Sequence, residues 1–152
     1  MSTFVPQQVT RTYVQTLAGP PDRILPLLTP EGERHWAEGW DPTVLHDAPG
    51  RDGTVFVTRA HGHADTLWLL VRYDEVRGYV RYYRITPDSN VTELDVALRA
   101  VSPGVTQATV RYTYTGLSDE GNRLVASRTE EYYREFMMGW ETALNRYLNA
   151  TA

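Results

Sequence analysis

The sequence contains no cysteine and no lysine, and all fifteen of its basic residues are arginine. The lack of cysteine excludes disulfides, thiolate metal sites and a cysteine nucleophile. The net charge of −4 lacks the basic excess that a nucleic-acid groove normally shows. No stretch approaches the about 18 apolar residues of a membrane span, and the N-terminus has no basic flank followed by an apolar run. We therefore expect a cytoplasmic protein with no nucleic-acid partner, no signal peptide and no membrane span.

Motifs for nucleophilic catalysis and for phosphate binding are also missing. There is no Gly-x-Ser-x-Gly elbow, no serine that the sequence ties to a histidine, and no glycine-rich phosphate loop. His61 and His63 could form a metal set with His35 or His46, because residues two apart on a strand face the same way. The pair falls where a hairpin should turn, however, and no carboxylate stands at a recognisable ligand spacing. The sequence thus disfavours hydrolases and nucleotide-using enzymes, and predicts no metal and no cofactor.

What the chain does have is an unusual set of aromatic residues. Ten tyrosines and four tryptophans stand against three phenylalanines, within 152 residues. Tyrosine and tryptophan each carry a polar group that needs a hydrogen-bond partner when it is buried. They therefore suit a semi-polar cavity or a hydrated interface, including that of a homodimer. The length suits one domain, and no linker, repeat or low-complexity run divides it, so we expect a single domain over residues 1–152.

The last thirty-odd residues predict one long helix over residues 119–149. Ser118 can cap its start, Asp119 and Glu120 place negative charge on the first turn, and no proline follows. Spacings that are mostly of four residues predict an apolar stripe of Val125, Tyr132, Phe136, Trp140, Leu144 and Leu148. The opposite face, expected in water, carries Arg128, Glu131, Arg134, Glu135, Glu141 and Arg146.

Upstream of that helix, the pattern predicts strands separated by short turns. A first strand is expected at residues 10–17, followed by two short helical pieces with a break near Thr29 and Pro30. The further strands are expected at residues 44–47, 54–60, 66–73, 79–86, 91–101 and 106–115. The last two of these alternate between apolar and polar residues, and the short connections favour antiparallel neighbours. The predicted fold is α+β: a curved antiparallel sheet of about seven strands, covered by the closing helix.

This order of elements resembles that of a known superfamily. Together with the segments PPDRILPLLTPEGERHWAEGW and YTGLSDEGN…YYREFMMGWETALNRYL, it is similar to the START-related, polyketide cyclase and birch-pollen-allergen superfamily (SRPBCC), which has the helix-grip fold. The resemblance covers nearly the whole chain at the level of pattern and includes no catalytic signature. It implies a cavity between sheet and long helix for an apolar or aromatic small molecule, and leaves the chemistry open.

Candidate cavity residues follow from placing the aromatic residues on that fold. The set comprises Tyr13, Trp36, Trp40, Trp68, Tyr83, Tyr112, Phe136 and Trp140. They could stack on a flat ligand and orient it, or they could form ordinary core. Arg81 is the arginine expected to point inward, because it shares a strand face with Tyr79, Tyr83 and Ile85. The alternative is that Arg72, Arg81 and Arg84 form cross-strand pairs with Glu93 and Asp95 on the solvent face.

Three functional hypotheses remain open from the sequence. The first is binding of an apolar or aromatic, lipid-like or polyketide-like molecule in the cavity. The second is an enzyme resembling the aromatases and cyclases, in which Arg81 and a tyrosine polarise a carbonyl, or in which a tyrosine, His35 or Glu93 acts as acid or base. The third is a protein-interaction module resembling the chaperone ATPase activators. The first is favoured, and whether the protein is an enzyme is left undecided.

Overall fold

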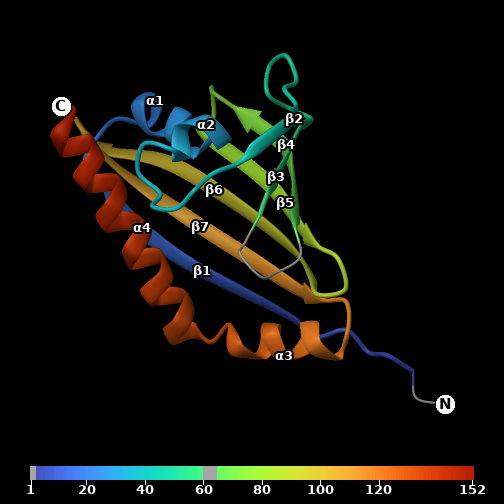
Figure 1. Ribbon diagram of the computed structural model, residues 1–152. Helices are drawn as coiled ribbons and strands as arrows, with labels where there is room; N and C mark the ends of the chain where they lie inside the picture. Colours follow the sequence, from blue (N-terminus) through green and yellow to red (C-terminus); the bar gives the residue numbers. More distant parts are fainter. Residues whose placement is uncertain (1–2, 60–64) are drawn as a thin grey trace.

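The computed structural model of the chain describes residues 3–59 and 65–152. Seven antiparallel strands form one sheet in the order β1-β7-β6-β5-β4-β3-β2. The sheet curves around a long helix, with short helices at one end (Figure 1). Its strands are β1 Gln8–Leu17, β2 Thr43–His46, β3 Thr54–Thr58, β4 Thr66–Asp74, β5 Tyr79–Thr86, β6 Asn90–Ser102 and β7 Val105–Gly116. This arrangement confirms the predicted sheet. The expected hairpin turn at His61 and His63 lies outside the described residues.

The concave face of the sheet is apolar because its two longest strands alternate as predicted. In β7, Ala108, Val110, Tyr112 and Tyr114 are all buried. Residues directly opposite one another in antiparallel strands share a face, and Leu94 and Val96 of β6 lie opposite Tyr112 and Val110. The outer face carries polar pairs such as Asp95 with Arg111, whose Oδ2 and Nη2 lie 2.8 Å apart.

Short helices follow β1 because prolines set where each one starts. They are α1 Pro21–Ile24, the 3-10 helix η1 Leu25–Leu28 and α2 Pro30–Glu33. The predicted break at Thr29 is confirmed, because its hydroxyl accepts a hydrogen bond from the Gly32 amide at 3.0 Å and so caps α2. A Cβ at Gly32 would lie 1.9 Å from the Pro26 carbonyl oxygen. Only glycine therefore allows α2 to pack so closely on η1.

The closing segment is two helices, so the prediction of one uninterrupted helix is wrong. Helix α3 spans Asp119–Ser127 and α4 spans Glu130–Ala150. Ser118 caps α3 as expected, but Thr129 caps a second helix by accepting a hydrogen bond from the Tyr132 amide at 3.1 Å. Arg11 donates from Nε to the Arg128 carbonyl at 2.9 Å, which supplies a partner for a backbone group that the break exposes. The break lets α3 lie under one end of the sheet while α4 runs across it (Figure 1).

The buried face of α4 differs from the predicted stripe. Its buried residues are Tyr133, Met137, Leu144 and Leu148, whereas Tyr132 is exposed and Phe136 and Trp140 are half-buried. A spacing of four drifts around a helix whose repeat is 3.6 residues, so a stripe drawn by fours leaves the core at one end. No helix in the described part of the chain is long and apolar enough to cross a membrane.

Glu141 is not the solvent-facing residue that the helix pattern predicted. Its carboxylate accepts hydrogen bonds from the Thr16 amide at 2.6 Å and from the Tyr13 hydroxyl at 3.2 Å. Asn145 adds a pair of bonds to the same strand, with the Ala18 amide and the Thr16 carbonyl. Helix α4 thus covers the free edge of β1, which would otherwise offer unpaired backbone groups to another chain.

Candidate functional site

A cavity of about 250 Å³ lies between the sheet, α2 with the loop that follows it, and the middle of α4. The loop and α2 supply Glu33, Trp36, Ala37, Glu38, Gly39 and Trp40; the sheet supplies Trp68, Tyr82, Arg84, Leu94 and Tyr112; and α4 supplies Phe136 and Trp140. This set includes all four tryptophans of the chain. The tryptophans noted in the sequence therefore converge on one hollow.

Three of the indole N–H groups are already bonded to the protein. Trp36 donates to the Leu27 carbonyl at 2.7 Å, Trp40 to the Pro30 carbonyl at 2.8 Å, and Trp68 to the Thr58 hydroxyl at 2.9 Å. Each bond satisfies the single polar atom of the side chain and fixes the ring orientation. What these residues present to the cavity is apolar ring surface.

The rings also hold one another in place. Trp40 meets Trp68 edge to face with centroids 5.4 Å apart, and Trp36 meets Trp140 in the same way at 5.3 Å. Such arrangements are the favoured ones for aromatic pairs. Trp36, Phe136 and Trp140 also line a groove on the outer surface of α4. These three rings therefore lie between the cavity and that groove.

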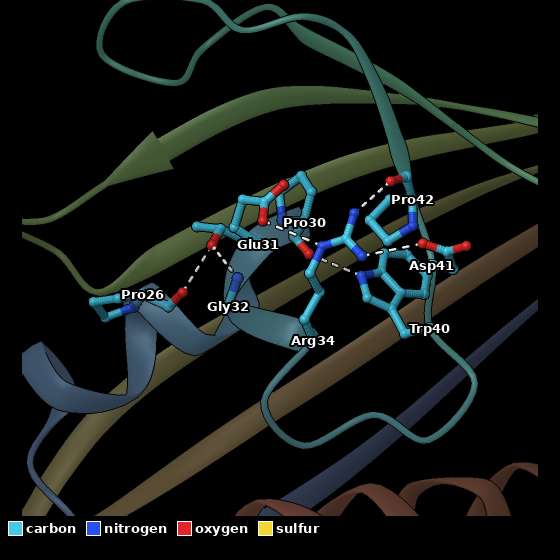
Figure 2. Close-up of polar contacts among 9 residues, drawn as sticks. Pro26, Pro30, Glu31, Gly32, Arg34, Trp40, Asp41 and Pro42 are labelled. Carbon is cyan, nitrogen blue, oxygen red and sulfur yellow. Dashed lines mark hydrogen bonds and ion pairs between the residues drawn. The ribbon is translucent and has the colours of Figure 1, made fainter.

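The loop that carries Trp36 and Trp40 is fastened at its base, as Figure 2 shows. The Arg34 guanidinium donates to the Pro42 carbonyl at 2.6 Å and forms ion pairs with Glu31 and Asp41 at 3.2 and 3.1 Å. Both carboxylates are exposed, so the ion pairs contribute little to stability on their own. Together with the Trp40 bond to Pro30 they tie the two ends of residues 34–42 together and hold the Trp40 indole in place.

Among the polar groups in the cavity, Arg84 of β5 carries a permanent positive charge. Its guanidinium carbon lies 5.4 Å from the centroid of Trp68 and 5.8 Å from that of Tyr112. Both distances suit cation–π attraction. Its one hydrogen bond to a described residue is a long one, from Nη2 to the Thr92 hydroxyl at 3.5 Å.

Two acids line the cavity: Glu33, the last residue of α2, and Glu38, which is exposed. Burial raises the pKa of Glu33 to about 8, because the surrounding aromatic groups solvate its carboxylate poorly. No ion pair with an arginine offsets this among the described residues. A carboxyl group in that condition is mostly protonated at neutral pH. Titratable groups with shifted pKa values inside clefts are typical of functional sites.

Tyr112 of β7 lines the same cavity as Arg84 and Glu33. Burial raises the pKa of Tyr112, while the positive charge of Arg84 opposes the rise and Tyr114 and Glu33 add to it. The Tyr112 hydroxyl has no hydrogen-bond partner among the described residues, in contrast to Tyr82, whose hydroxyl donates to the Leu28 carbonyl at 2.6 Å. The tyrosine remains neutral over the physiological range and can donate to a ligand.

Six of the predicted cavity residues lie in the cavity wall: Trp36, Trp40, Trp68, Tyr112, Phe136 and Trp140. Tyr13 does not. It lies in a separate groove beside the start of α4, where its hydroxyl donates to Glu141. Whether any of the six binds a ligand stays a prediction.

The prediction that Arg81 points inward is wrong, and so is the prediction that Tyr83 lines the cavity. Both side chains lie on the outer face of β5, where Arg81 Nε bonds to the Tyr79 hydroxyl at 3.0 Å and pairs with Glu93 at 3.5 Å. The Tyr83 hydroxyl donates to the same carboxylate at 3.1 Å. The inner face carries the even-numbered residues, because Tyr82 lies directly opposite Leu94 of the apolar face of β6.

The turn between β5 and β6 indicates this register only once its closing pair is known, and the sequence alone does not give that pair. Thr86 pairs with Asn90, and counting back in twos from that pair brings Arg84 opposite Thr92 and Tyr82 opposite Leu94. The sequence prediction missed Arg84, Tyr82 and Leu94 because the closing pair of this turn was not known. Glu33 had no comparable signal, since its burial depends on how the short helices meet the sheet.

No protein-family model matches the chain, and no curated protein matches it in sequence. Solved structures do match. Norcoclaurine synthase from Thalictrum flavum, in complex with dopamine and hydroxybenzaldehyde, aligns at a TM-score of 0.72 with 11% identity over 97% of this chain and 90% of that one. The chain has the helix-grip fold. Ara h 8.0201 matches at 0.70 and a protein of Thermus thermophilus at 0.68, each with 15% identity over 95% of this chain and 99% of the other.

These structures confirm the helix-grip fold that the resemblance in the sequence implied. At these identities the likeness concerns the fold, and the chemistry must be argued from the residues of the cavity. In the described part of the chain, no group of three or more His, Cys, Asp or Glu side chains is placed to hold a metal ion.

Proposed function

We propose that this protein binds a flat, apolar or aromatic small molecule in the cavity beneath α4. The observation that carries the proposal is the convergence of all four tryptophans on one hollow, three of them with their N–H groups bonded to the protein. Two of these tryptophans are buried and two are half-buried, and placing them around empty space forfeits packing energy that a filled core would gain. A bound ring would recover those contacts.

The size of the cavity narrows the class of ligand. Small-molecule sites are commonly about 300–1,000 Å³, and this one is about 250 Å³. One or two rings would fill it, whereas a long acyl chain would not fit without enlarging it. Among the ligands expected from the sequence, the structure thus favours a compact aromatic molecule over a lipid. The norcoclaurine synthase structure with dopamine and hydroxybenzaldehyde provides a precedent for single-ring ligands in this fold.

The test is calorimetric titration with 2-naphthol, followed in parallel by the four tryptophan indole N–H signals in a ¹⁵N-correlated NMR spectrum. Saturable binding should shift several of these signals, because all four rings line the cavity. Ala37→Phe should abolish binding by filling the cavity. Ala97→Phe, the same change on the outer face of β6, should leave it unchanged. Equal loss in both variants, or no saturable binding to the unaltered protein, would contradict the proposal.

An enzymatic function is the second candidate, and Glu33 is the observation that favours it. A carboxyl group with a pKa of about 8 can take or give a proton near neutral pH, and Arg84 in the same cavity could stabilise an enolate. If so, the unaltered protein in D₂O should catalyse the exchange of the methyl protons of 2-naphthyl methyl ketone for deuterium. The Glu33→Gln variant should catalyse this exchange more slowly. Equal exchange rates would leave binding as the function. The protein-interaction and homodimer hypotheses stay predictions.

A further inference from the structure

Two arginines three residues apart on β5 have opposite surroundings. Arg81, on the outer face, is paired with Glu93 at 3.5 Å. Arg84, on the inner face, lines the cavity and forms no ion pair within 4.0 Å among the described residues. Buried charges are normally paired, because removing a charge from water costs free energy that a partner must offset. Arg84 is half-buried and has no such partner among the described residues, so a ligand can supply one.

The guanidinium of Arg84 is held in place but not saturated. The rings of Trp68 and Tyr112 restrict its position, with centroids 5.4 and 5.8 Å away. Thr92 can only accept from it, because the Thr92 hydroxyl donates its own hydrogen to Asn90 at 2.7 Å. Arginine has five N–H donors, and the long bond to Thr92 uses one of them. Several donors in a fixed, poorly solvated position are therefore left for a ligand.

The other ionisable groups in the cavity do not cancel this charge. Glu33 is mostly protonated at neutral pH because burial raises its pKa to about 8. Tyr82 of β5 and Tyr112 of β7 are neutral because burial raises the pKa of each. Glu38 is exposed at the rim, and α4 contributes only Phe136 and Trp140. The interior of the cavity therefore carries a net positive charge.

We propose, resting on the cavity-binding function above, that the occupant is a one- or two-ring aromatic carboxylate whose carboxylate group is bound by Arg84. The planar fork of a guanidinium matches a carboxylate with two parallel hydrogen bonds, a geometry that no ammonium group could reproduce. Tyr112 supplies a further donor beside it. The tryptophan rings enclose the aromatic part, and the low polarity of their surroundings strengthens the charge–charge attraction.

The experiment compares two probes of nearly equal shape, 2-naphthoate and 2-naphthamide, by calorimetric titration at pH 7. Hydrogen bonds to charged groups favour the anion by about ten- to hundred-fold in affinity. Arg84→Gln should bring the two affinities together, because it weakens the binding of naphthoate and leaves the binding of naphthamide unchanged. Arg81→Gln, the matched change on the outer face of the same strand, should preserve the preference. Thermal unfolding of both variants verifies that they fold.

Each outcome separates the two proposals. Equal affinity of the unaltered protein for both probes would overturn the carboxylate inference while leaving cavity binding intact. Failure of either probe to bind would overturn both. Loss of the preference in Arg81→Gln as well would show that it arises from overall charge and not from Arg84. If Arg84→Gln does not fold, Arg84→Lys should keep the charge but lose most of the preference, and retention of the full preference would contradict the bidentate geometry.

Discussion

The interior of this protein divides into two parts that are built differently. Under the C-terminal half of α4 the core is closed: Leu144 and Leu148 are fully buried, and a Cβ added at Gly19 would lie 3.4 Å from a Leu148 methyl group. Under the middle of α4 the interior is an aromatic cavity of about 250 Å³ that contains a carboxyl group and a guanidinium. The same helix packs tightly at one end and covers a hollow at the other.

The contrast shows where the fold is optimised for stability and where it is not. Aliphatic packing under Leu144 and Leu148 gains free energy from every buried methylene. Around Glu33 and Arg84, half-buried ionisable groups lose part of their water without an ion-pair partner in the described residues, which lowers stability. Proteins retain such features where they serve a function, so the difference between the two parts directs attention to the cavity.

The largest effect is expected in the closed core. Leu144→Ala should lower the free energy of unfolding by about 2–5 kcal/mol, because it leaves a sealed void under a fully buried side chain. Met138→Ala, on the same helix at a side chain that is 49% exposed, should cost much less. Urea unfolding of both variants measures this. Similar losses in the two would show that the core is not where the structure places it.

Glu33→Gln should stabilise the protein, and do so in a pH-dependent way. The pKa of Glu33 is about 8 in the fold against 4.5 for an unperturbed group. The folded state therefore holds a proton that the unfolded state has lost, and stability falls as the pH rises from about 4.5 to about 8. Glutamine removes this dependence, so the variant should gain up to ~3 kcal/mol at pH 7 and little at pH 4.5.

The matched control for this prediction is Glu93→Gln on the outer face, where the carboxylate pairs with Arg81 and accepts from Tyr83. This variant should lose a little stability, up to about 1 kcal/mol, because the pair is partly exposed. Urea unfolding at several pH values distinguishes the two. A gain for Glu33→Gln that does not change with pH would mean that its carboxyl group titrates normally.

Trp140→Ala tests whether α4 covers open space. The side chain is half-buried and contacts Trp36 and Phe136 at the cavity wall. Its loss should cost about 1–2 kcal/mol, below the about 3–5 kcal/mol of a core tryptophan, because the change widens an existing opening and creates no sealed void. Binding of 2-naphthol should weaken in the same variant. A cost of 4 kcal/mol or more by urea unfolding would place Trp140 in the packed core.

The smallest effect is expected at Gly139, on the outer surface of α4 beside the cavity wall. A Cβ there would meet nothing within 4 Å, so Gly139→Ala should gain about 0.5–1 kcal/mol from helix propensity. The same substitution at Gly32 should destabilise, because its Cβ would collide with the Pro26 carbonyl. Thermal unfolding measures both. A loss of stability in Gly139→Ala would indicate contacts on this face that the structure does not contain.

Much of the fold could be predicted because its signals are local. Alternation in β6 and β7, prolines at the starts of the short helices and Ser118 before α3 each act within a few residues. The break at Thr129 could not be predicted in this way. In the sequence, Thr129 is compatible both with a helix interior and with a helix cap. The Arg128 carbonyl that the break exposes is bonded by Arg11, which lies more than a hundred residues away in the chain.

The candidate site was predictable in its aromatic part and not in its polar part. Tryptophans on the loop, on β4 and on α4 had few other places to be buried in a helix-grip fold. Arg81 and Arg84 look alike in sequence, and both lie in a strand with apolar residues on each face. Only the pairing of Tyr82 with Leu94 decides between them.

By itself the sequence determined the kinds and order of the elements, because propensity, capping and alternation are properties of neighbouring residues. Tertiary structure decided which face of β5 turns inward, where Glu33 loses its water, and that Glu141 covers the edge of β1. The physical reason is that strand register and burial depend on groups distant in the chain. A shift of one residue in register exchanges the two faces of a strand, and in β5 that exchange decides which arginine reaches the cavity.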